Sequence, residues 1–319
     1  MTARRFGLTT SPPPDDAHRW AAFGASVRGA AHVREDLPNQ DAEACRGDDS
    51  GRWAAVAVAD GHGHSLAVRA DRGAALAVDV ALAAAQSCWD VLGGRPDRFV
   101  AATVSQQLPD VMADNWMASV EHDLRERPFS RAELERSGNA EALTAQPEAA
   151  YGTTLLVALA VGGSIVACQV GDGDLVAVTA DGGVVRPLPP DNRLVGTKTT
   201  SLASRTAHAD FRSSHLEVGH ERIEVIVLAT DGYVNSFSAE DGFAAAGRDL
   251  WKLIRQVGPS QVEGALANWL ETTSSDGTGD DATLAILFDE AGFASDNRAA
   301  AVTMTVSDAT VSDGEEAGS

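Results

Sequence analysis

The sequence predicts an α+β protein in which strands form a sheet core and helices cover it. Apolar runs typical of strands fall in two groups, one ending at residue 60 and one starting after residue 150. An alanine-rich stretch with apolar residues at helical spacing follows the first group, and two more helical stretches precede the last strand. Because sheets and amphipathic helices must each bury an apolar face, this order favours helices packed on sheets.

The N-terminal half is expected to contribute two strands and then two helices. The strands are predicted at Phe23–Val27 and Trp53–Ala59, and the second is continuously apolar, as a buried strand would be. The helices are predicted over residues 65–92 and 97–127. Proline and glycine then indicate a looser region between residues 128 and 150.

The C-terminal half is richer in strands. Apolar runs separated by glycine-containing turns predict five of them, at residues 154–161, 164–170, 174–179, 224–229 and 282–288. Residues 187–215 lack regular periodicity and are expected to form a long surface excursion, a kind of segment that is often functional in compact domains. Helices are expected over residues 248–257 and 259–272.

The pattern predicts one continuous domain, over residues 21–290, because no linker interrupts it. Residues 1–20 are polar and contain proline, so we expect a loose N-terminal segment. Residues 291–319 are small, acidic and almost free of aromatic side chains, which predicts a disordered acidic tail.

The composition limits the class of partner. The 25 Lys and Arg residues against 46 Asp and Glu give a net charge of −21, which argues against nucleic-acid or anionic-membrane binding and favours cations or basic protein partners. Three cysteines without a Cys-x-x-Cys pair argue against a disulfide framework or a zinc site. The apolar runs are expected to be too short or too broken to span a bilayer. We therefore expect a soluble, cytoplasmic protein.

Acidic side chains stand where strands end or turn. Asp-Gly follows two strongly apolar strands, and the acidic positions at strand ends or turns are Asp41, Asp60, Asp172, Asp231 and Asp280. One Asp-Gly pair alone is more often a turn than a ligand. Two such pairs after buried strands favour a site for hard cations such as Mg²⁺ or Mn²⁺, which prefer oxygen ligands. A shared carboxylate in such a site can bridge two ions about 3.5–4 Å apart and support attack of water on phosphorus.

His62 follows the first of these pairs directly. An imidazole beside the metal site could protonate a leaving oxygen near neutral pH. The alternative is that His62 only caps a turn, and the residue pattern alone leaves both interpretations open.

Six short blocks in order resemble the metal-dependent protein phosphatase 2C family, particularly its bacterial members. The blocks span residues from about 39 to 288 and are Asn39–Gln40–Asp41–Ala42, Val58–Ala59–Asp60–Gly61–His62–Gly63, Tyr151–Gly152–Thr153–Thr154, Gln169–Val170–Gly171–Asp172–Gly173–Asp174, Ala229–Thr230–Asp231–Gly232–Tyr233 and Asp280–Asp281–Ala282–Thr283. Each block is a weak signal alone, whereas six in sequence are highly specific. The resemblance implies a four-layer α-β-β-α sandwich of two antiparallel sheets flanked by helices, with a dimetal site at one end.

The resemblance also implies metal ligands. Asp60 would bridge two Mn²⁺ or Mg²⁺ ions, and Gly61 would offer its carbonyl to one of them. Asp231 and Asp280 would hold the other ion. Asp172 matches a position that can support a third ion in bacterial members.

The activity implied is hydrolysis of phosphoserine or phosphothreonine in proteins phosphorylated by a serine/threonine kinase, through a metal-activated water. Asp41 would orient that water, and His62 matches the general acid of the family. The excursion at 187–215 corresponds to a mobile flap.

The chain departs from the family pattern in three places. Asp36 stands where an arginine usually clamps the substrate phosphate, and the nearest arginine is Arg34, our candidate for that role. Gln40 replaces a common acidic residue, and Asp281 replaces the usual asparagine after the last ligand. We favour Asp280 over Asp281 as the ligand because Thr283 then keeps its expected register. The displaced arginine motivates an alternative function, a pseudophosphatase that binds phosphoproteins or kinases without turnover.

Overall fold

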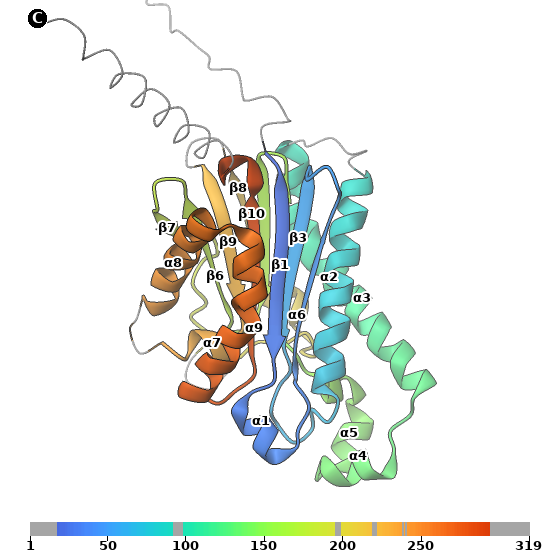
Figure 1. The fold of residues 1–319 in the computed structure, drawn as a ribbon. Helices are drawn as coiled ribbons and strands as arrows, with labels where there is room; N and C mark the ends of the chain where they lie inside the picture. The colour runs from blue at the N-terminus through green and yellow to red at the C-terminus, as the bar shows by residue number, and fades with distance from the viewer. Residues whose placement is uncertain are drawn as a thin grey trace, which may run out of the picture.

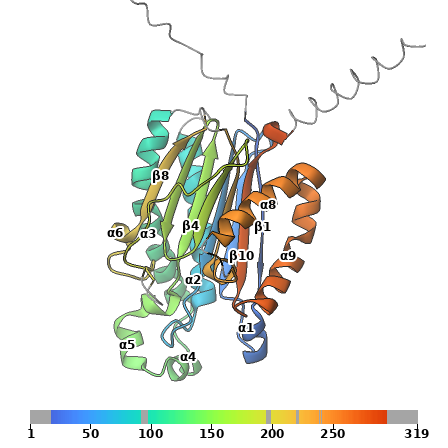
Figure 2. The same ribbon diagram turned by 90° about the vertical axis from the view of Figure 1, so that its left-hand side faces the viewer.

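The computed structural model describes residues 18–91, 98–194, 199–218, 222–237, 239 and 241–293. Two antiparallel sheets of five strands each pack face to face, and helices cover both outer faces (Figures 1 and 2). The expected four-layer α-β-β-α sandwich is therefore confirmed.

The strands of each sheet come from both halves of the chain. The first sheet has the order β1 (Trp20–Val27), β10 (Ala282–Asp289), β9 (Ile223–Ala229), β6 (Asp174–Thr179) and β7 (Val184–Val185). The second has the order β2 (Asp41–Gly47), β3 (Trp53–Asp60), β4 (Leu155–Val161), β5 (Ser164–Val170) and β8 (Arg212–Glu217). All paired strands are antiparallel, so neighbouring strand ends bring distant sequence blocks together.

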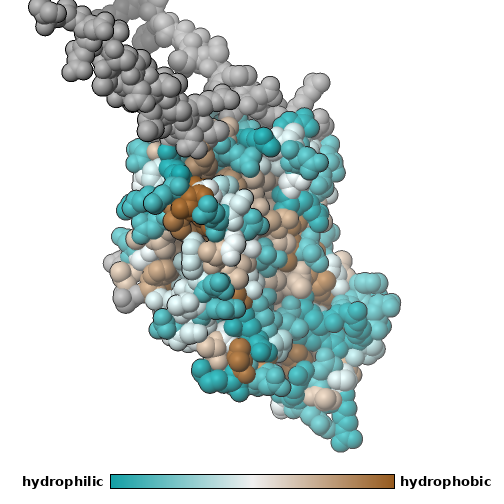
Figure 3. Space-filling model, in the orientation of Figure 1, coloured by the Kyte–Doolittle hydropathy of each residue, from teal (hydrophilic) through white to brown (hydrophobic). Residues whose placement is uncertain are grey.

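The long helices form the outer layers. Helices α2 (Ala70–Val91) and α3 (Arg98–Glu126) cover the second sheet, and α8 (Gly242–Val257) and α9 (Pro259–Asp276) cover the first. Shorter helical segments lie in the connections: α1 (Ala30–Glu35), α4 (Arg131–Arg136), α5 (Ala140–Ala145), a 3₁₀ turn (Pro147–Tyr151), α6 (Ala207–Asp210) and α7 (Asp231–Val234). The face in Figure 3 is largely hydrophilic, with hydrophobic residues in small groups.

Strand β3 shows why a central strand of this sandwich is continuously apolar. Val56 and Val58 belong to the core between the two sheets. Trp53 and Ala57, which point the other way, belong to the core under α2 and α3. Because side chains alternate between the two faces of a strand, a strand covered on both sides has no polar face.

Most predicted elements are confirmed, with differences at their ends. The region 128–150 is not loose, because it contains α4, α5 and the 3₁₀ turn. The excursion at 187–215 contains α6 and the start of β8, so the prediction of a structureless segment is wrong there, and its residues 195–198 lie outside the described part. Strand β2 was not predicted, because most of its residues are polar or only half buried.

The predicted terminal segments lie mostly outside the described residues. Strand β1 begins at Trp20, and the last described residue is Phe293. Both loose-segment predictions, for residues 1–20 and 291–319, therefore remain predictions.

Helix α2 is long and apolar enough to cross a membrane by length and composition, which the sequence reasoning had not anticipated. Half of its most apolar 18-residue window is buried inside the protein. Its alanine-rich face packs on β3, as in the core helix of a globular domain.

Arg69 connects the segment before α2 to the region between α3 and α5 through hydrogen bonds. The Arg69 guanidinium is 5% exposed and donates to the Glu133 carboxylate at 2.6 and 3.1 Å. It also donates to the carbonyls of Arg127 and Pro128 and to the Tyr151 hydroxyl. Ser130 and Glu133 form a capping box at the start of α4. These contacts explain why the region 128–150 is ordered.

We expect Arg69→Ala to lower the free energy of unfolding by about 3 kcal/mol, because it leaves buried acceptors without a donor. Urea unfolding followed by circular dichroism measures this loss. Arg131→Ala is the matched control, since its ion pair with Glu135 is exposed and should contribute little. Equal stability of the two variants would contradict this role of Arg69.

Candidate metal centre

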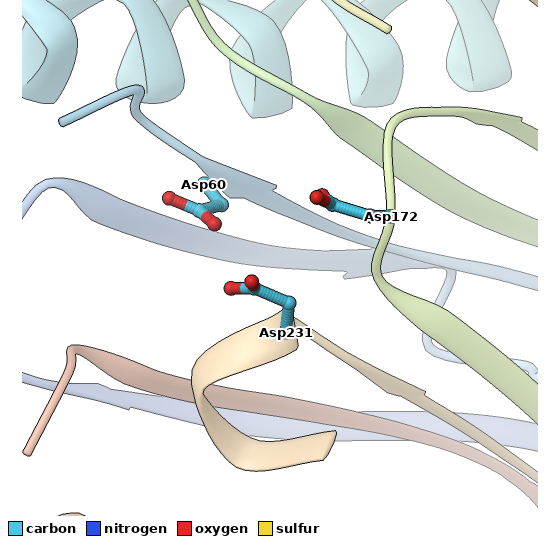
Figure 4. A group of neighbouring side chains, drawn as sticks. All are labelled: Asp60, Asp172 and Asp231. Carbon is cyan, nitrogen blue, oxygen red and sulfur yellow. The ribbon is translucent and has the colours of Figure 1, made fainter. Parts of the chain in front are cut away.

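Three aspartates from separate elements converge at one end of the sandwich. Asp60 ends β3, Asp172 lies in the turn between β5 and β6, and Asp231 begins α7 directly after β9. Each offers a carboxylate oxygen, and these oxygens lie within 4.8 Å of one another. Their side chains point toward a common space (Figure 4).

The backbone around Asp60 is held by the block that follows the 3₁₀ turn. The Asp60 amide donates to the Thr154 hydroxyl at 3.0 Å, and the Asp60 carbonyl accepts from the Thr154 amide and the Thr153 hydroxyl. The Gly61 amide donates to the carbonyl of Gln40. Within the described residues no donor contacts the Gly61 carbonyl, and Gly61 lines the same cavity as Asp60. Gly61 therefore has a backbone oxygen available at the site, and its role as a metal ligand stays a prediction.

The turn that carries Asp172 requires glycine before it. Gly171 has a φ of +110°, and a Cβ there would lie 2.4 Å from the Thr154 side chain. The Gly171 amide donates to the Thr200 hydroxyl at 2.8 Å. Thr200 belongs to the excursion predicted at 187–215, so this segment borders the metal centre.

The cavity at this end has a volume of about 850 Å³. Its lining includes the three converging aspartates and also Gly61, His62 and Asp280. The segment around residues 199–204 forms another part of its wall. The sequence-predicted candidates Asp41 and Arg34 are not among the described lining residues.

Burial and mutual repulsion raise the pKa values of the clustered carboxyl groups. The pKa of Asp60 is well above its usual range, first through burial and then through the charges of Asp41 and Asp231. Burial and the charge of Asp231 also raise the pKa of Asp172. The pKa of Asp280 is raised by the same two causes. A divalent cation would relieve this repulsion, and the oxygen donors suit Mg²⁺ or Mn²⁺. The donor set therefore fits the metal that the sequence predicts.

Asp41 lies beside Asp60 on the neighbouring strand. The two residues are paired in the β2–β3 ladder, and Asp41 is 8% exposed. One carboxylate oxygen of Asp41 accepts from the Thr230 and Thr283 hydroxyls, both at 2.7 Å. Burial raises the pKa of Asp41 to about 8, so in the metal-free protein this group is largely protonated at neutral pH.

Asp280 and Asp281 have different surroundings. Asp281 is 3% exposed, and its carboxylate accepts from the amides of Gly29 and Gln40, both at 2.6 Å, and contacts His32 Nδ1 at 2.8 Å. Asp281 thus ties three parts of the β1–β2 connection to the start of β10. The Asp280 side chain is exposed at the cavity, outside the group formed by Asp60, Asp172 and Asp231, and its role as a ligand stays a prediction.

Two loops approach closely beside this pair. A Cβ on Gly232 would lie 2.0 Å from the Asp281 carbonyl oxygen. Only glycine after Asp231 therefore allows the loop before β10 to come within reach of the aspartates.

His62 is half buried at the cavity. Its amide donates to the Gly152 carbonyl at 2.9 Å, and its ring lies 5.8 Å from that of His64. Burial, followed by the charge of His64, lowers the pKa of His62 to about 4. The ring is therefore neutral at pH 7 before any anion binds beside it.

Arg34 and His32 both lie on α1, with different exposure. Arg34 is exposed, and its role as phosphate clamp remains a prediction. His32 lines the cavity and contacts Asp281. Sequence reasoning missed His32 because nothing in its neighbourhood in the chain marks it, and only the contact with Asp281, 249 residues away, places it at the site.

The comparisons with known proteins agree with this geometry. The family model described as Protein phosphatase 2C matches residues 28–271, so the chain belongs to the protein phosphatase 2C family. No curated protein matches the sequence.

Solved structures share the fold at low sequence identity. A bacterial serine phosphatase is 13% identical with a TM-score of 0.53, covering 84% of this chain and 96% of that one. The catalytic domain of the serine/threonine phosphatase PstP, in complex with two manganese ions, is 17% identical with a TM-score of 0.51, covering 85% and 98%. PppA, a regulatory component of T6SS in Pseudomonas aeruginosa, is 18% identical with a TM-score of 0.50, covering 85% and 98%.

The metal-free protein should lose stability as pH rises. The folded-state pKa of Asp41 is about 8 against an ordinary value of 3.8, so its stabilising protonation is complete below pH 4 and is lost as pH rises through 8. One such group contributes at most about 1.4 kcal/mol per pH unit. We expect the urea midpoint in EDTA to fall between pH 5 and 8.5, and to fall less steeply in Asp41→Asn. A midpoint that rises over this range would contradict the prediction.

Substitutions at Asp280 and Asp281 should have separable effects. Asp280→Asn should weaken Mn²⁺ binding, measured by calorimetry, with little change in stability. Asp281→Asn should lower the free energy of unfolding by about 2 kcal/mol, because one acceptor oxygen becomes a donor facing amide donors. Weaker Mn²⁺ binding in Asp281→Asn, with a loss of stability in Asp280→Asn, would indicate that Asp281 is the ligand.

Proposed function

We propose that the protein is an active serine/threonine protein phosphatase that depends on Mn²⁺ or Mg²⁺. The observation that carries the proposal is the convergence of Asp60, Asp172 and Asp231 in an open cavity of a protein phosphatase 2C chain. A cluster of repelling carboxylates is unfavourable unless cations bind it.

In this proposal Asp60, the Gly61 carbonyl, Asp231 and Asp280 would hold two ions, with Asp60 shared between them. Asp172 would support a third ion. When bound, the cations would supply a water activated for attack on phosphorus. PstP, a solved structure of the same fold, contains two manganese ions, which is consistent with this number.

The remaining steps use side chains of the chain itself. Asp41 accepts two hydroxyl hydrogen bonds, which fix its carboxylate beside Asp60, and from there it orients the attacking water. His62 donates a proton to the leaving seryl or threonyl oxygen. A phosphate dianion beside the ring favours the imidazolium form and thus raises the pKa of His62 from its low value in the substrate-free protein.

We infer that the substrates are phosphoproteins made by a serine/threonine kinase, with basic residues near the phosphorylated site. The net charge of −21 favours such segments by electrostatic complementarity. Cys45, Cys88 and Cys168 are all free thiols, which is consistent with a cytoplasmic location.

The alternative is a module that binds phosphoproteins or kinases without turnover. One observation favours it: among the described residues that line the cavity there is no arginine or lysine. Arginine is the side chain that most often binds phosphate in a bidentate manner.

The test is hydrolysis of a phosphothreonine peptide with and without Mn²⁺. We expect turnover to depend on the metal. In Asp231→Asn the rate of hydrolysis should fall by more than about a hundredfold, since even an outer-shell partner of a metal ligand can contribute that much. Asp249→Asn is the control, because Asp249 is exposed on α8 and its ion pair in the described part of the chain is with Lys252. Phosphopeptide binding without hydrolysis at saturating Mn²⁺ would support the alternative instead.

A further inference from the structure

The basic side chains near the metal centre are unusual for a site that binds phosphate. In the part of the chain that the structure describes, those lining the cavity are His32, His62 and His64. Of these, His62 is assigned to the leaving group, and His64 is exposed beside it. His32 lies on α1 and contacts Asp281, directly before β10.

The His32 ring is fixed in position from one side. Its side chain is 15% exposed, and Nδ1 lies 2.8 Å from the buried Asp281 carboxylate. The same carboxylate accepts from the amides of Gly29 and Gln40, which flank the segment carrying His32. The ring is therefore held by a rigid partner, and the loss of side-chain entropy on binding a ligand is small.

The second ring nitrogen is available to a ligand. Among the described residues, Nε2 of His32 has no hydrogen-bond partner, while the ring lines the cavity. His32 and Asp280 line the same cavity, so a donor at Nε2 would lie at the edge of the metal centre.

We propose that His32 binds the phosphoryl group of the substrate, with Nε2–H donating to a phosphate oxygen that the cations do not hold. The proposal rests on the proposed function, because it names the group that meets the phosphate of that site. In this arrangement Nδ1 faces the Asp281 carboxylate at 2.8 Å and Nε2 faces the phosphate, so each ring nitrogen contacts a negatively charged oxygen, and hydrogen bonds of that kind are the strong ones. His32 thereby takes the role that the sequence assigned to Arg34, two residues further along the same helix.

The test measures phosphate binding apart from turnover. Inorganic phosphate is titrated by calorimetry into the full-length, manganese-loaded protein and its variants. His32→Asn is the informative change, because the asparagine amide can still donate to Asp281 in place of Nδ1 but has no counterpart of Nε2. We expect phosphate to bind about tenfold or more weakly to this variant, since hydrogen bonds to charged groups contribute roughly 1.5–3 kcal/mol.

Three further measurements separate this role from a structural one. Manganese affinity and the thermal midpoint of His32→Asn should equal those of the wild type, and His122→Asn, an exposed histidine on α3, should bind phosphate normally. If the protein hydrolyses a phosphopeptide, His32→Asn should raise its KM more than it lowers its kcat. His32→Gln should recover part of the phosphate affinity, because its longer amide reaches the position of Nε2.

Each result decides the proposal. It is overturned if the wild type does not bind phosphate, if His32→Asn binds it normally, or if manganese affinity falls in parallel. It is also overturned if Arg34→Ala, and not His32→Asn, weakens binding. If phosphate binding depends on His32 but no peptide is hydrolysed, the phosphate contact stands and the proposed enzymatic function fails.

Discussion

Burial of both faces of the central strands is the constraint on which the other features depend. Each central strand packs one face against the opposite sheet and the other against a helix layer, as the residues of β3 and β9 in adjacent cores show. Polar groups are therefore confined to strand ends and connections. Because neighbouring strands are antiparallel, the ends of β3 and β9 and the turn after β5 meet at one end of the sandwich. The acidic site is a consequence of that geometry.

A cluster of buried carboxylates costs free energy in the metal-free state, and the structure compensates part of that cost locally. Hydroxyl groups of Thr230 and Thr283 donate to Asp41, and three donors surround Asp281. Burial nevertheless raises the pKa values of Asp41, Asp60 and Asp172. Asp281 is held by donors from the β1–β2 connection, whereas Asp60 and Asp172 line the cavity with Asp231.

The resemblance block Asp280–Asp281–Ala282–Thr283 illustrates how far the sequence could go. Its spacing favoured Asp280 as the ligand, which stays a prediction. The structure shows that Asp281 is buried among amide donors and that Asp280 lines the cavity. Proline and glycine led to the wrong prediction that the region 128–150 is loose, whereas in the structure Ser130 and Glu133 form a capping box there. The Arg69 contacts that order this region span about 60 positions and leave no local pattern.

The sequence by itself determined most of the strands, the long helices and the family, because these follow from local hydrophobic periodicity and from short motifs in a fixed order. It also determined which side chains could be metal ligands, since Asp-Gly after a buried strand is a local feature. Only the tertiary structure decided that Asp60, Asp172 and Asp231 lie within 4.8 Å of one another and that His32 lines the cavity while Arg34 does not. The reason is physical: these relations depend on strand pairing and loop packing between residues far apart in the chain, which no local pattern encodes.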